Sequence, residues 1–63
     1  MKDWNRIQHE FEIISNEIAT TGRTNRTVAY HGREVHPLEA VEDCGQFCYR
    51  VEDNGEQFWV LAE

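Results

Sequence analysis

Three dipeptides ending in glycine divide the second half of the chain into short stretches in which polar and apolar residues alternate. They are His31-Gly32, Cys44-Gly45 and Asn54-Gly55. Asn54-Gly55 is the strongest hairpin signal, because Asn and Gly both tolerate the positive φ angles that a type I′ turn requires. Cys44-Gly45 is a weaker version, since only its glycine suits that geometry. The pattern therefore predicts consecutive antiparallel hairpins between residues 27 and 62.

The Asn54-Gly55 turn also predicts which side chains share a face of this sheet. Pairing across the turn sets Val51 opposite Phe58, and period-two alternation assigns every other residue to the same face. We expect this core face to carry Phe47, Tyr49, Val51, Phe58, Val60 and Ala62, and the opposite face to carry Cys48, Arg50, Glu52, Gln57, Trp59 and Leu61.

The strand before the Cys44-Gly45 turn contains the only proline of the chain. Pro37 has no N–H group to donate, so we expect this strand to bend or bulge there. Alternation across the turn predicts two residues on the core face, Leu38 and Ala40, and two on the opposite face, Glu39 and Val41.

Apolar residues recur at steps of three and four in the first third of the chain, which predicts an apolar stripe along a helix. Asp3 precedes the stripe and can act as the N-cap, and Gly22 follows it and can adopt the left-handed conformation that ends a helix. We expect a helix over about residues 3–21 and a polar connector at 22–27, with Phe58 of the sheet meeting the stripe near Phe11 and Ile14. The stripe comprises Trp4, Ile7, Phe11, Ile14 and Ile18.

The expected fold is α+β. Residues 1–63 would form a single domain, with one amphipathic helix on a three- to four-stranded antiparallel sheet that could also curl towards a small barrel. No apolar run approaches the roughly 20 residues that span a bilayer, and charges interrupt the N-terminus where a signal peptide needs an apolar core. We therefore expect a cytoplasmic protein without membrane contact, in which a disulfide is disfavoured.

Two cysteines and two histidines are the residues that most suggest a chemical site. His31, His36, Cys44 and Cys48 have local spacings within the range of zinc sites. The hairpins, however, put His31 and Cys44 at opposite ends of one strand, too far apart for a single ion. Cys48 is expected among apolar neighbours, which raise the pKa of a thiol rather than activate it. We expect no metal, no cofactor and no catalytic residue, and hence a protein that is not an enzyme.

Charge is unevenly distributed along the chain. Residues 1–33 carry five basic and four acidic side chains, and residues 34–63 carry one basic and eight acidic side chains, which gives +1 and −7. The acidic half disfavours direct binding of nucleic acid, which depends on neutralising phosphates with Lys and Arg. Two explanations remain open: the charge serves solubility, or it forms an acidic surface for a basic partner.

Trp59 is the strongest candidate for a binding residue, because nothing in so short a chain is expected to cover the face opposite the helix. Exposed Trp and Arg residues are enriched where binding energy concentrates. Two structural alternatives are that Arg50 stacks on Trp59 and that the sheet curls enough to bury Trp59. The predicted partner-binding set combines this face with the acidic turns and comprises Trp59, Arg50, Leu61, Val41, Glu42, Asp43, Glu52, Asp53 and Glu56.

In size, acidity and lack of catalytic residues the chain is similar to small proteins of phages and mobile elements, a similarity that no particular motif carries. Many of those proteins cap a host protein, including anti-CRISPR proteins, which implies a protein that binds and inhibits a protein partner with a basic surface. A second hypothesis is self-association, through two sheet faces or edges, into a homodimer. A third is a nucleic-acid adaptor that uses Arg23, Arg26 and Arg33, although a salt bridge from Arg33 to Asp53 or Glu56 would give that arginine a structural role.

Overall fold

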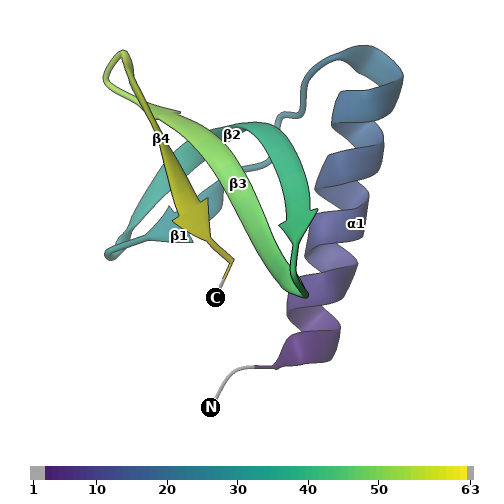
Figure 1. Ribbon diagram of the computed structural model, residues 1–63. Helices are drawn as coiled ribbons and strands as arrows, with labels where there is room; N and C mark the ends of the chain where they lie inside the picture. The colour runs from purple at the N-terminus through teal and green to yellow at the C-terminus, as the bar shows by residue number, and fades with distance from the viewer. Residues whose placement is uncertain (1–2, 63) are drawn as a thin grey trace.

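The computed structural model describes residues 3–62, which form one helix and one four-stranded antiparallel sheet (Figure 1). The α+β prediction is confirmed. The sheet has the strand order β1-β2-β3-β4, so each strand pairs with its neighbour in the sequence. The elements are α1 (Trp4–Thr21), β1 (Val28–Tyr30), β2 (Arg33–Asp43), β3 (Gln46–Asp53) and β4 (Glu56–Leu61).

Both ends of α1 are capped as the sequence predicts. The Asp3 carboxylate accepts a hydrogen bond from the backbone N–H of Arg6 at 3.2 Å, which satisfies one of the amides left unpaired in the first turn. Gly22 has φ +87° and donates its N–H to the carbonyl of Ile18 at 2.8 Å. The left-handed conformation at Gly22 ends the helix at Thr21.

The connector after α1 is tied back to the helix through Glu17. The Thr24 hydroxyl, which is buried, donates to the Glu17 carboxylate. The Nε of Arg26 donates to the same carboxylate at 3.2 Å. The hydrogen bond from Thr24 is the largest cause that lowers the pKa of Glu17, and the hydrogen bond from Arg26 is the second. These contacts fix the path of the chain from α1 to β1.

All three hairpins turn through two residues with positive φ. His31, Cys44 and Asn54 have φ angles of 50°, 51° and 54°, and the glycine after each lies between 78° and 85°. This is the type I′ geometry, whose twist matches that of the flanking strands. Cys44 therefore adopts the turn conformation although its side chain disfavours it by roughly 1–2 kcal/mol.

The register of β3 and β4 is the predicted one. Val51 lies opposite Phe58 and Tyr49 opposite Val60, and the N–H of Ala62 donates to the carbonyl of Phe47 at 2.9 Å. Residues Tyr49, Val51 and Val60 are buried, so the core face is assigned correctly.

Strand β2 contains the expected irregularity, because its register with β3 shifts between Pro37 and Glu39. The assignment of Leu38 to the core face was wrong. Pro37 instead lies opposite Val51 and is fully buried, and Leu38 is the extra residue at the bulge and is only half-buried. A bulge shifts the alternation by one residue, so the residues before it change faces relative to a regular strand.

The core lies between α1 and the concave face of the sheet. The Phe11 ring is 4.6 Å from that of Phe47 and 5.7 Å from that of Tyr49, measured between centroids. The Phe58 ring lies 5.2 Å from that of Tyr30 and packs against the buried cluster that includes Phe11 and Ile14. The buried apolar residues are Ile7, Phe11, Ile14, Val28, Val35, Tyr49, Val51 and Val60.

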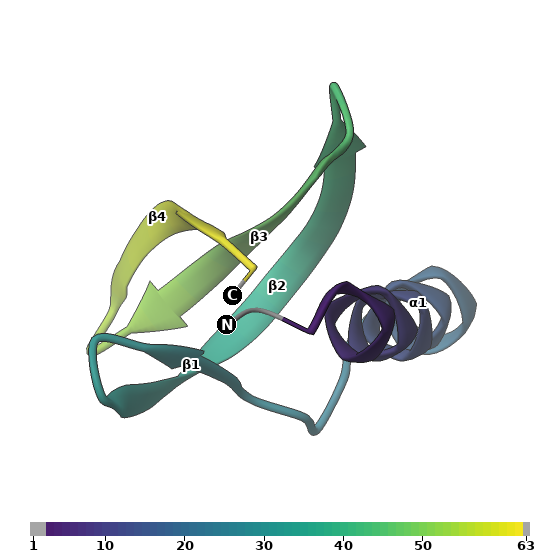
Figure 2. The same cartoon turned by 90° about the horizontal axis from the view of Figure 1, so that it is seen from below.

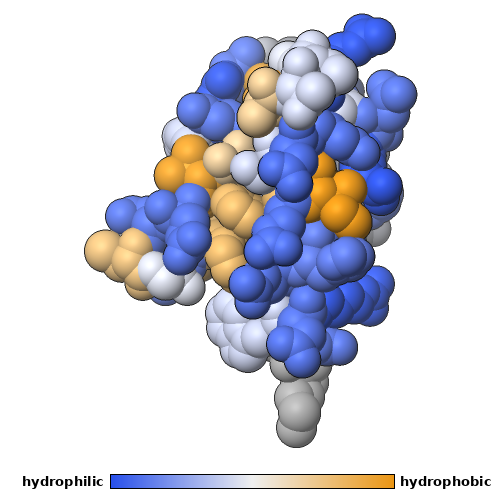
Figure 3. All heavy atoms as spheres, turned by 90° about the vertical axis from the view of Figure 1, so that its right-hand side faces the viewer, coloured by the Kyte–Doolittle hydropathy of each residue, from blue (hydrophilic) through white to orange (hydrophobic). Residues whose placement is uncertain are grey.

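Trp4 was expected in the core stripe, but 54% of its surface is exposed. It lies in the first turn of α1, and that end of the helix reaches the margin of the sheet (Figure 1). A side chain one turn before Ile7 therefore has less sheet beneath it to bury against. On the side of the molecule formed by α1, hydrophilic side chains cover most of the surface, with apolar groups showing between them (Figure 3).

The sheet curls but does not close into a barrel. Seen along the helix axis, α1 lies on the β2 side of the sheet, and β1 and β4 lie away from it (Figure 2). Strands β1 and β4 are the two edges. Within residues 3–62, no helix is long and apolar enough to cross a membrane.

Candidate binding face on the sheet

The face of the sheet that points away from α1 carries a row of apolar side chains. In the strand register, Cys48 lies opposite Val41 on one side and Leu61 on the other. Trp59 lies two residues before Leu61 on the same face of β4. Exposure is 54% for Trp59, 55% for Leu61 and 36% for Val41, and Cys48 is half-buried. Val41, Cys48, Trp59 and Leu61 are called the Trp59 face below.

Carboxylates border one end of the Trp59 face. Glu42 and Asp43 follow Val41 at the end of β2 and help to line a shallow hollow of about 390 Å³ on this face. Both residues are exposed, so their charges remain solvated. The face therefore combines open apolar surface with negative charge. Five of the nine predicted partner-binding residues line this hollow: Val41, Glu42, Asp43, Trp59 and Leu61.

Arg50 lies beside Trp59 in the ladder but is held by other groups. Its Nε donates to the Glu39 carboxylate at 3.2 Å, and its Nη1 donates to the side-chain oxygen of Gln57 at 2.7 Å. Glu39 and Trp59 lie opposite Arg50 on either side. The contact between Arg50 and Glu39 could have been predicted from the sequence, because pairing across the Cys44-Gly45 turn sets Glu39 opposite Arg50.

The second acidic group lies at the other end of the sheet. Glu52, Asp53 and Glu56 flank the Asn54-Gly55 turn, whereas Glu42 and Asp43 precede the Cys44-Gly45 turn, and β3 separates the two turns. The Asp53 carboxylate is 2.6 Å from the guanidinium of Arg33, as one sequence alternative expected. The acidic residues thus form two separate groups, and only the Glu42 group borders the hollow.

The arginines proposed for nucleic-acid binding are engaged in ion pairs. Arg26 pairs with Glu17 at 3.2 Å and Arg33 pairs with Asp53 at 2.6 Å. Two of the three positive charges assigned to that hypothesis are therefore balanced by carboxylates. This weakens the case for a phosphate-binding surface, which needs uncompensated positive charge.

The cysteines and histidines lie apart. His31 and Cys44 occupy the turns at opposite ends of β2, an 11-residue strand. At about 3.3 Å per residue, a strand of that length separates its ends by tens of ångströms. Cys44 and Cys48 are free thiols. Across the part of the chain that the structure describes, no group of three or more His, Cys, Asp or Glu side chains is arranged to hold a metal ion.

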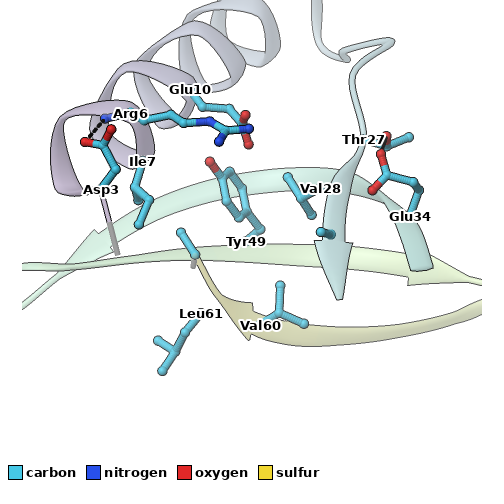
Figure 4. A pocket seen from close by; sticks show the side chains of 12 residues that line it. Asp3, Arg6, Ile7, Glu10, Thr27, Val28, Glu34, Tyr49, Val60 and Leu61 are labelled. Carbon is cyan, nitrogen blue, oxygen red and sulfur yellow. Dashed lines mark hydrogen bonds between the residues drawn. The ribbon is translucent and has the colours of Figure 1, made fainter. Parts of the chain in front are cut away.

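A second cavity, which the sequence did not predict, opens between α1, β1 and β4 (Figure 4). Its volume is about 400 Å³. Val28 and Val60 form apolar walls, and the Tyr49 side chain points from the floor towards Arg6 and Glu10 of the helix. Burial, and then the charge of Glu10, raise the pKa of Tyr49 to about 12. This cavity depends on where α1 lies relative to the strand edges, which no local pattern specifies.

Comparison with protein-family models, with curated proteins and with solved structures finds no match to the chain. The properties of the Trp59 face itself therefore indicate what it can do. Open apolar surface can exclude water from a contact with a partner, and carboxylates beside it attract positive charge and favour one orientation of approach. Both properties suit a protein–protein contact.

Proposed function

We propose that this protein binds a protein partner with a basic surface through the Trp59 face. The observation that carries the proposal is the exposure of Trp59 and Leu61 in one row with Val41 and Cys48, on the side of the sheet away from α1. Exposed apolar patches on small proteins commonly mark interaction sites. Tryptophan contributes strongly to binding energy when a partner buries it.

Charge supports the choice of partner. The chain has a formal net charge of −6, and Glu42 and Asp43 border the Trp59 face. Like charges repel across an interface and opposite charges speed association, so a basic protein surface fits best. Covering such a surface would block its own ligands, and we therefore extend the proposal to inhibition, in the manner of the small anti-defence proteins of phages and mobile elements.

Trp59→Ala, with Trp4→Ala as its matched control, tests the proposal. Both tryptophans are 54% exposed, but only Trp59 lies on the proposed face. The immobilised wild type and both variants are first used in parallel to capture the partner. Calorimetry then measures the affinity of the captured partner for each of the three proteins. We expect Trp59→Ala to weaken binding by about 2 kcal/mol or more, the usual threshold for a hot spot, and Trp4→Ala to leave it unchanged. Equal affinities for all three proteins would contradict the proposal.

Two double variants test the role of charge. Glu42→Gln with Asp43→Asn removes the group beside the hollow, and Glu52→Gln with Glu56→Gln removes the group at the far turn. We expect the first double variant to associate with the partner more slowly than the second, and with a weaker dependence on salt. The dissociation rate should change little. If both double variants associate at the wild-type rate at low salt, the acidic residues serve solubility alone.

A further inference from the structure

The two edge strands are joined at one end of the sheet and separated at the other. Near the turns, the rings of Tyr30 in β1 and Phe58 in β4 lie 5.2 Å apart. Further along, the 400 Å³ cavity opens between Val28 of β1 and Val60 of β4, with the first turns of α1 as its third wall (Figure 4). No backbone ladder joins β1 to β4 across this gap in the described residues.

The outer edge of β4 has backbone groups that can accept another strand. The Asn54-Gly55 turn makes Asp53 and Glu56 a hydrogen-bonded pair, and such pairs alternate along an antiparallel ladder. The bond from the Ala62 N–H to Phe47 follows this alternation. The intervening residues therefore direct their N–H and C=O groups away from β3, towards the open edge: Gln57, Trp59 and Leu61.

From Gln57 to Leu61, β4 lacks the features that protect an edge against strand addition, and its one charged residue, Glu56, lies at the turn. Proteins usually shield an exposed edge with proline, lysine, a bulge or a very short strand. Residues 57–61 contain no proline and no charged side chain. The pairing of β4 with β3 runs without a register shift from the Asp53–Glu56 pair to the Cys48–Leu61 pair. The other edge strand, β1, is only three residues long. Strand β4 is thus the edge suited to pairing.

The two hollows of the molecule meet at β4. Val60 and Leu61 line both of them, with Val60 directed into the cavity and Leu61 to the other side of the strand (Figure 4). Side chains of an extended segment alternate between the two faces of a sheet. A segment paired with β4 would therefore place one set of side chains in the cavity and the other set on the Trp59 face.

We infer that β4 binds an extended segment of the partner as an added strand, in which basic residues alternate with apolar ones. This inference rests on the proposed function and specifies how that partner is held. Carboxylates predominate beside both hollows: Asp3, Glu10 and Glu34 line the cavity against one basic residue, Arg6, and Glu42 and Asp43 line the hollow on the Trp59 face. Against these charges, a second copy of this chain would bring its own excess of carboxylates. A basic segment therefore fits better than self-pairing.

The first experiment uses a six-residue peptide in which Lys or Arg alternates with Val, at about 1 mM because short flexible peptides bind weakly. Amide hydrogen exchange is followed by NMR with and without the peptide. We expect exchange at Trp59 and Leu61 to slow at least tenfold, and the same peptide with Glu in place of Lys and Arg to have no effect. Absence of protection with the basic peptide, or equal protection with the acidic one, would overturn the inference.

The second experiment removes an outward-facing donor from β4. Leu61→Pro deletes an N–H that the β3 ladder does not use, and Leu61→Ala is its matched control, which shortens the side chain but keeps the N–H. Both variants should melt cooperatively. We expect Leu61→Pro to bind the basic peptide and the captured partner at least tenfold more weakly than Leu61→Ala. Gln57→Pro and Gln57→Ala provide a second pair that leaves the Trp59 face intact.

The outcomes separate this inference from the proposed function. If Trp59→Ala weakens partner binding while Leu61→Pro and Leu61→Ala behave alike, the partner docks on the face without adding a strand. If Trp59→Ala and Trp4→Ala are indistinguishable from the wild type, the proposed function fails as well. Protection of Trp59 and Leu61 that rises with protein concentration in the absence of peptide, together with a doubled mass in solution, would assign the edge to a second copy and overturn the inference.

Discussion

The rings of Tyr30 and Phe58 lie 5.2 Å apart at an interplanar angle of 50° and connect the first strand of the sheet to the last. No backbone ladder joins these two strands in residues 3–62. A second contact at the same end is the ion pair between Arg33 and Asp53, which links the first hairpin turn to the third. These two side-chain contacts connect the edges of the curled sheet at the end where the first and third turns lie.

The contact between Tyr30 and Phe58 should be measurable as a coupling energy. We expect Tyr30→Leu and Phe58→Leu to be non-additive by about 0.5–1.5 kcal/mol, the range for paired aromatic rings. Urea unfolding of the wild type, the two single variants and the double variant gives this value. Additive effects would mean that the rings contribute only through the surface that each buries.

Ile14 and Ile13 are neighbours on α1 with different environments, which makes them a matched pair. Ile14 is fully buried, and Ile13 is only partly buried. We expect Ile14→Val to lower the free energy of unfolding by about 0.5–1.5 kcal/mol, and Ile13→Val to change it by less than about 0.5 kcal/mol. Denaturation midpoints measure both changes. A larger loss of stability for Ile13→Val than for Ile14→Val would contradict the assignment of the buried face of α1.

Alkaline pH should destabilise the protein through Tyr49. Burial raises the pKa of this phenol to about 12, from an ordinary value of 10.0. The unfolded chain therefore loses the proton first, so the stabilisation is complete below pH 10 and is lost as the pH rises towards 12. We expect a loss on the order of 2 kcal/mol over that range. Thermal melts of Tyr49→Phe should show a shallower alkaline decline than the wild type, whereas Tyr30→Phe should retain the full decline.

Acid should act on the fold through Glu17. The Thr24 hydroxyl and then Arg26 lower the pKa of this carboxyl below its ordinary 4.5. Its stabilising effect is therefore present at neutral pH and is lost as the pH falls through the lowered value. We expect Glu17→Gln to be less stable than the wild type at neutral pH, with the difference shrinking as the solution is acidified. Urea midpoints across this range measure the effect, and Glu12→Gln on the exposed side of α1 is the control.

Much of the architecture could be predicted from the sequence because it depends on local rules. The glycines after His31, Cys44 and Asn54 specify two-residue turns, and a turn of known length fixes the register of both strands. The exposed positions of Trp59 and Leu61 follow from that register. The core-face prediction failed at Leu38, where a bulge shifts the alternation, and the sequence could place a disturbance at Pro37 without specifying which residue is extra.

The cavity and the exposure of Trp4 depend on how α1 sits against the sheet, and local patterns do not contain that information. The apolar spacing identifies which face of the helix is buried but not how far the helix extends past the strands. Trp4 fits the stripe as well as Ile7 does, yet only Ile7 is buried. The cavity beside β4 likewise exists because α1 and the edges of the sheet leave a space that none of them fills.

The pairing of every strand with its sequence neighbour has a kinetic consequence. Each hairpin closes through a two-residue turn, so the chain forms its sheet without first bringing distant segments together. Folding rates rise as contacts become more local, and isolated hairpins form within about 1–10 μs. The steps that join distant segments are the docking of α1 on strands that are synthesised later and the contact between Tyr30 and Phe58. During translation the apolar side of the helix therefore leaves the ribosome before β3 and β4. It stays exposed until these strands have been synthesised and cover it.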